Sequence, residues 1–123
     1  MTHILIVDDD TNNQRILSYT LRKAGYEVSV AGNGAEGLTA LSGCLIDLAI
    51  IDLAMPVMDG LTMLRSMRNG PSPCDIPVIM LTASGDDSVR TAVEAESVNG
   101  YLTKPSSSRI LLEKIKQILG EAA

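Results

Sequence analysis

Polar residues stand at the ends of four separate apolar runs, and this placement constrains the fold more than any other feature of the chain. The runs and the polar residues that end them are Ile4–Val7 with Asp8 and Asp9, Leu48–Ile51 with Asp52, Val78–Leu81 with Thr82, and Tyr101–Thr103 with Lys104. If the runs are parallel strands of one sheet, these groups meet at its carboxyl edge, where open α/β sheets bind their ligands. The sequence therefore predicts one shared site.

The apolar runs alternate with segments of helical period, which is the pattern of a βα repeat. We expect strands over 3–7, 27–30, 47–52, 77–82 and 100–103, and helices over 12–24, 35–42, 60–68, 88–97 and 108–119. Right-handed crossovers place helices on both faces of such a sheet. The prediction is a doubly wound α/β fold with five parallel strands, forming a single domain over 1–123.

The first helix carries apolar side chains at helical spacing. We expect its inner face to present Ile16, Leu17, Thr20, Leu21 and Ala24. Gly25 follows this stripe directly and is expected to stop the helix.

Composition limits the classes of function. A formal net charge of −5 argues against nucleic-acid binding by this domain, which would show a basic stripe. No apolar stretch approaches the roughly 20 residues of a membrane span, and the N-terminus lacks a signal-peptide core. Cys44 and Cys74 are isolated and lack metal spacing, which indicates reduced thiols. We expect a cytoplasmic protein that does not bind membranes.

The residues at the strand ends suit a divalent cation and a phosphoryl group. An aspartate can attack phosphorus to form an acyl phosphate, which makes Asp52 the leading candidate for phosphorylation. Mg²⁺ prefers oxygen ligands, and we expect Asp9 and Asp52 to bind it directly and Asp8 directly or through a water. Lys104 and Thr82 can each donate to a phosphoryl oxygen.

Each of these residues also has an ordinary structural explanation. Asp8-Asp9-Asp10 alone is more often a solvated turn or a helix N-cap than a metal site. Thr82 alone is a common β-former, and Lys104 alone is usually a surface charge. The joint occurrence of complementary chemistry at four strand ends, with spacings that fit one domain, favours the functional interpretation.

Four stretches carry a more specific joint pattern: Ile4–Asp10, Ile51–Gly60, Pro77–Ala83 and Gly100–Pro105. Together they resemble the receiver domain of two-component response regulators, over essentially the whole chain. The resemblance implies a flavodoxin-like (βα)5 sheet in the strand order 2-1-3-4-5. It also implies a phosphorylatable switch of a two-component system or phosphorelay.

The resemblance assigns a role to each site residue. Asp52 is the phosphoacceptor, which takes its phosphoryl group from a phosphohistidine on a histidine kinase or a histidine phosphotransfer protein. Asp8 and Asp9 match the acidic pair that places Mg²⁺, and Ala54 matches the position whose backbone carbonyl completes the protein ligands.

By the same resemblance, three further residues transmit the signal. Thr82 matches the switch hydroxyl, Lys104 the lysine that contacts the phosphate, and Tyr101 the aromatic residue that changes burial on activation. The output surface is formed by the fourth helix, fifth strand and fifth helix. It acts on a downstream protein or on an output domain in the same chain. No enzyme activity is expected beyond the chain's own phosphorylation and dephosphorylation.

Two other functions fit part of this pattern. A haloacid-dehalogenase-like phosphatase also uses an aspartyl phosphate, Mg²⁺, a strand-end hydroxyl and a lysine. It needs an acidic pair after the lysine, however, and nothing beyond Lys104 supplies one, since Glu113 is mid-helix and alone. A receiver-like module that binds partners without phosphorylation would usually have lost Asp52, Lys104 or a member of the acidic pair, and this chain retains all of them.

Overall fold

Five parallel strands form one sheet, and its edge strand β2 is followed in space by β1, β3, β4 and β5. The strands are β1 (His3–Val7), β2 (Glu27–Ala31), β3 (Leu48–Asp52), β4 (Val78–Thr82) and β5 (Gly100–Thr103). The computed structural model describes residues 2–43, 46–52, 60–69, 76–82, 100–103 and 108–120. The predicted strand order 2-1-3-4-5 is confirmed.

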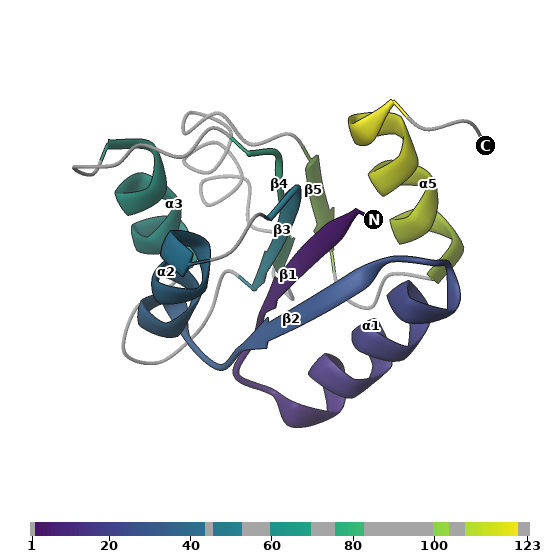
Figure 1. The fold of residues 1–123 in the computed structure, drawn as a ribbon, viewed down its shortest axis with the longest axis horizontal. Helices are drawn as coiled ribbons and strands as arrows, with labels where there is room; N and C mark the ends of the chain where they lie inside the picture. Colours follow the sequence, from purple (N-terminus) through teal and green to yellow (C-terminus); the bar gives the residue numbers. More distant parts are fainter. Residues whose placement is uncertain are drawn as a thin grey trace.

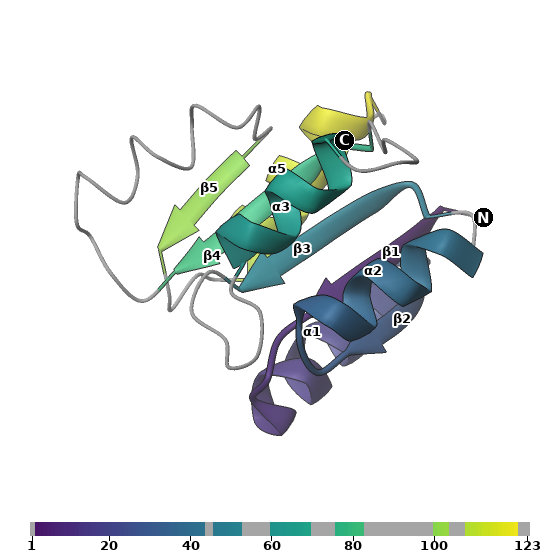
Figure 2. The ribbon, with the colours of Figure 1, turned by 90° about the vertical axis from the view of Figure 1, so that its left-hand side faces the viewer.

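Helices cover both faces of the sheet, which confirms the doubly wound α/β fold. They are α1 (Thr11–Lys23), α2 (Gly34–Gly43), α3 (Gly60–Asn69) and α5 (Ser108–Leu119). Figure 1 shows α2 and α3 on one side of the strands and α1 and α5 on the other. Figure 2 shows α2 and α3 in front of the sheet. The helix expected over 88–97 lies outside the described residues.

The sheet separates two apolar cores because successive strand residues point to opposite faces. Leu5 and Val7 belong to the core under α2 and α3, whereas Ile4 and Ile6 belong to the core under α1 and α5. All five residues of β3 are buried. Strands covered on both faces are continuously apolar, which explains why the sequence shows unbroken apolar runs there.

Helix α1 has clear signals at both ends. The side chain of Asp10 accepts hydrogen bonds from the backbone N–H groups of Asn12 and Asn13, as an N-cap does. At the other end Gly25 has a φ of 101°, a backbone conformation that side chains disfavour and that stops the helix.

The predicted inner face of α1 is partly wrong. Ile16 is 61% exposed and Ala24 is also exposed, whereas Leu21 and Ser18 are buried. The buried stripe therefore passes through a polar residue. The predicted Leu17 and Leu21 do belong to the apolar core, so only part of the predicted face is misplaced, and apolar spacing could not include a buried serine.

None of the helices within the described residues is long and apolar enough to cross a membrane.

Candidate functional site

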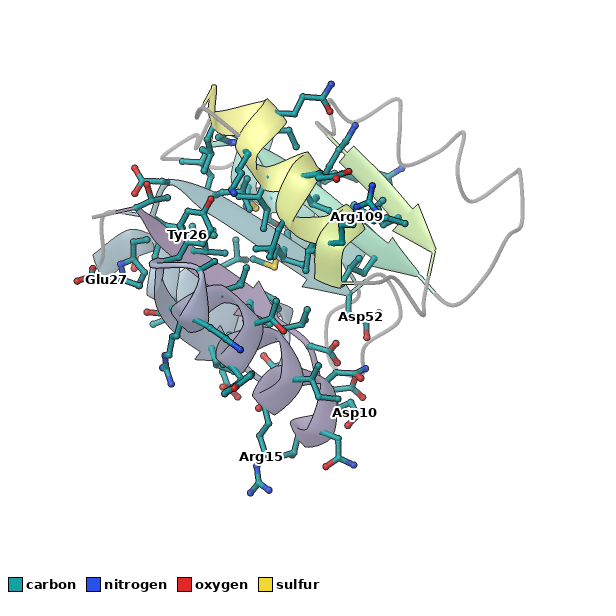
Figure 3. All side chains as sticks on the ribbon, turned by 90° about the vertical axis from the view of Figure 1, so that its right-hand side faces the viewer. Asp10, Arg15, Tyr26, Glu27, Asp52 and Arg109 are labelled. Carbon is teal, nitrogen blue, oxygen red and sulfur yellow. The ribbon has the colours of Figure 1, made fainter. Side chains whose placement is uncertain are left out.

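Three carboxylates converge where β1 and β3 end. Val7 pairs with Ile51, so the next residues, Asp8 and Asp52, follow at the same level of the sheet. Asp8, Asp9 and Asp52 can each offer one carboxylate oxygen such that all three oxygens lie within 4.8 Å of one another. Figure 3 shows Asp52 at the same end of the molecule as Asp10, the N-cap of α1. The topology thus brings together residues from distant parts of the sequence.

Burial makes the negative charges of this cluster energetically costly. Asp8 is 1% exposed and Asp52 is 6% exposed, whereas Asp9 is exposed. Carboxylates removed from water need compensation by hydrogen bonds or by positive charge. A hard divalent cation that prefers oxygen ligands supplies such charge, so the donor set fits Mg²⁺.

Hydrogen bonds hold the turn that carries the acidic pair. The backbone N–H of Asp8 donates to the carbonyl of Ala31 at 3.1 Å, which fixes the end of β1 against the end of β2. The N–H of Asp10 donates to Oδ1 of Asp8 at 2.9 Å. The side-chain amide of Gln14 donates to the carbonyl oxygen of Asp8 at 2.5 Å. Asp8 is therefore held through its N–H, its carbonyl and its carboxylate.

The strand register gives positions for only some of the remaining predicted site residues. Asp52 pairs with Leu81, so Thr82 continues β4 just past the phosphoacceptor candidate. Tyr101 lies in β5. The side chains of Thr82 and Tyr101, and all of Ala54 and Lys104, lie outside the described residues. Their proximity to the cluster stays a prediction.

Two further residues support the cluster, and only one of them had a signal in the sequence. Asp10 belongs to the acidic run, and its role as an N-cap was foreseeable from the helix that follows it. Gln14 had no comparable signal, because a glutamine in a helix is common and only the geometry of the turn brings its amide to Asp8.

Comparison with known proteins agrees with the resemblance to receiver domains. A family model described as the response regulator receiver domain matches residues 4–116. The probable transcriptional regulator ycf27 of Cyanidium caldarium is 40% identical over 117 residues, which cover 95% of this chain and 46% of the relative. The transcriptional regulatory protein GltR of Pseudomonas aeruginosa is 38% identical and covers 97% of this chain and 49% of its own length. The chain thus spans about half the length of these curated relatives.

Solved structures share the fold over nearly their whole length. The chemotaxis protein CheY4 of Vibrio cholerae superposes with a TM-score of 0.90 at 32% identity, and the match covers 97% of this chain and 99% of that one. A putative response regulator from Chloroflexus aurantiacus gives a TM-score of 0.90 at 38% identity, with 98% of each chain covered.

Proposed function

The chain belongs to the response regulator receiver domain family, and we propose that its 123 residues form a receiver whose phosphoacceptor is Asp52. Its homologues and structural neighbours support a phosphorylatable two-component signalling switch. The observation that carries the assignment of Asp52 is its nearly complete burial at the end of the central strand, within 4.8 Å of two further carboxylates.

The acidic cluster binds Mg²⁺ in this proposal. Asp9 and Asp52 supply direct carboxylate ligands, Asp8 binds directly or through a water, and the backbone carbonyl of Ala54 completes the protein ligands. The cation, when bound, neutralises charge on the peripheral phosphoryl oxygens, which is the main requirement of phosphoryl transfer. A carboxylate oxygen of Asp52 forms the new P–O bond as the P–N bond to the donor's imidazole breaks, and the leaving ring nitrogen keeps the electron pair and takes up a proton from water.

Thr82 and Lys104 complete the phosphate site in this proposal. The register supports it: Asp52 pairs with Leu81, and Thr82 pairs with Thr103, the residue before Lys104. Thr82 ends β4 and Lys104 directly follows β5 in the sequence, and these two strands come after β3 in order across the sheet. Thr82 acts as the switch hydroxyl, and Tyr101 changes burial when the hydroxyl moves.

The proposed partners follow from this chemistry. The phosphoryl donor is a histidine kinase or a histidine phosphotransfer protein, and the output is a downstream protein or an output domain in the same chain. This domain binds no nucleic acid itself and acts in the cytoplasm. It catalyses only its own phosphorylation and dephosphorylation.

Phosphorylation with a small donor tests the assignment. The chain is incubated with acetyl phosphate and Mg²⁺, and intact-mass spectrometry is expected to show one added phosphoryl group. Asp52→Asn and a chelator should each abolish it. Asp47→Asn is the matched control, because Asp47 is an exposed aspartate just before the same strand. Undiminished phosphorylation of Asp52→Asn would show that Asp52 is not the acceptor.

A further inference from the structure

Gln14 connects helix α1 to the acidic pair. Its backbone N–H donates to the carbonyl of Asp10 at 3.0 Å, which is the first hydrogen bond of the helix. Its side-chain Nε2 donates to the carbonyl oxygen of Asp8 at 2.5 Å. The side chain is half-buried. One residue thus closes the turn between strand and helix at two places.

The bond to Asp8 fixes a particular peptide group. The carbonyl of Asp8 lies in the same planar peptide unit as the N–H of Asp9, because the peptide bond does not rotate freely. Holding this carbonyl therefore fixes the direction in which the chain enters Asp9. The N–H of Asp10, which belongs to the next peptide unit, donates to the carboxylate of Asp8 at 2.9 Å. The turn is thus held on both sides of Asp9, by Gln14 at the peptide before it and by the Asp8 carboxylate at the peptide after it.

We infer that Gln14 is a positioning residue for the metal site, an inference that rests on the proposed function. By fixing the peptide between Asp8 and Asp9, its amide sets both carboxylates in place opposite Asp52 before a cation binds. Groups that orient metal ligands without touching the metal typically change metal affinity by about 10–100-fold when they are removed. We expect the lower end of that range, because Gln14 orients the ligands through the backbone.

The alternative is that Gln14 only stabilises the helix. Glutamine, methionine and alanine all have high helix propensity, so replacing Gln14 leaves α1 nearly unchanged. Gln14→Met keeps the length of the side chain and removes the donor. Asn12→Met is the matched control, since Asn12 is an exposed amide residue of the same helical turn.

Calorimetric titration of Mg²⁺ into the full chain tests the inference. The Kd of Gln14→Met should rise about tenfold, whereas Asn12→Met should keep the wild-type value. Phosphorylation by acetyl phosphate should return to the wild-type rate at saturating Mg²⁺, because only the metal affinity is lowered. In the metal-free state, NMR should show faster amide exchange at Asp10 in Gln14→Met, with the amides of β1 unchanged.

The outcomes separate this inference from the proposed function. If the wild-type chain binds no Mg²⁺, the proposed metal site and this inference both fail. If the wild-type chain binds Mg²⁺ and Gln14→Met binds it equally well, the inference alone is overturned. Gln14→Ala is the second variant, and its Kd decides the question if Gln14→Met is poorly folded.

Discussion

Asp8 and Asp52 lie at adjacent strand ends, one residue beyond the pair formed by Val7 and Ile51. Both are nearly fully buried, and together with the exposed Asp9 they bring carboxylate oxygens within 4.8 Å of one another. Like charges at this distance repel strongly where water is excluded. We therefore expect the cluster to reduce the stability of the fold when no cation is bound.

Asp52→Asn should stabilise the metal-free chain. The change removes one of the neighbouring negative charges and keeps nearly the same shape, so the gain in the free energy of unfolding is expected to be on the order of 1–3 kcal/mol. Urea denaturation in the presence of a chelator measures it. Glu27→Gln is the control for net charge, because Glu27 is exposed at the start of β2. An equal gain in Glu27→Gln would attribute the effect to net charge and not to the cluster.

Mg²⁺ should stabilise the wild-type fold. A ligand that binds only the folded state adds about 2.7 kcal/mol at 100 times its Kd, and the increase should appear as a higher thermal midpoint. Asp9→Ala should lose most of this increase, because it removes a direct ligand. Asp10→Asn should keep it, since an asparagine retains the N-cap and Asp10 is not part of the cluster. An unchanged Mg²⁺ effect in Asp9→Ala contradicts the assignment of Asp9 as a ligand.

Gly37→Ala should destabilise the packing between α2 and the sheet. A Cβ atom at Gly37 would lie 2.6 Å from Cε of Met63 and 3.0 Å from Cγ2 of Val7, both fully buried side chains. Overpacking of this kind costs about 1–3 kcal/mol against a gain of about 1 kcal/mol from higher helix propensity, so we expect a net loss of up to about 2 kcal/mol.

A double-mutant cycle separates these two effects. The background Met63→Ala removes the closest contact and leaves only Cγ2 of Val7 at 3.0 Å, so the added methyl group should cost much less stability in urea denaturation than in the wild-type background. The same loss of stability in both backgrounds would rule out a clash with Met63 as its cause.

Phosphorylation should change the surface of the domain through a shift between two conformations. Beryllofluoride, which mimics a phosphoryl group, is expected to change NMR signals of residues 89–97 and of Tyr101. Thr82→Ala should reduce these changes, because the variant lacks the hydroxyl that donates to the phosphoryl group and couples it to the conformational change. A complete shift from 1:99 to 99:1 requires about 5.5 kcal/mol of differential interaction, so a partial shift is an acceptable result. Changes confined to the turns after Asp9 and Asp52 would show binding without switching.

The fold was largely predictable from the sequence because β1 and β3 are buried on both faces, and continuous apolar runs mark such strands. The structure confirms the strands over His3–Val7 and Gly100–Thr103 at the predicted residues. The phase of α1 was not predictable in the same way. Leu21 is buried as predicted, but Ser18 is buried and Ile16 is exposed, and a pattern of apolar residues cannot point to a buried serine.

The sequence was sufficient to predict which strand ends form the candidate site. Parallel pairing explains why Asp8 and Asp52 come together, and the structure places Asp9 with them. Their roles in metal binding and phosphorylation stay predictions. The contact of Gln14 with Asp8 was beyond sequence reasoning, since it depends on the path of the turn and on the conformation of a long side chain.

The position of β1 between β2 and β3 has a consequence for how the chain folds. During synthesis β1 emerges well before β3, so it can pair first with β2 only and leaves its other edge open. Closing that edge requires a contact between residues far apart in sequence, which is a slow step in parallel sheets. Asp8 meets Asp52 only when this step is complete. Acquisition of metal affinity should therefore report, in a refolding experiment, the moment at which the two central strands join.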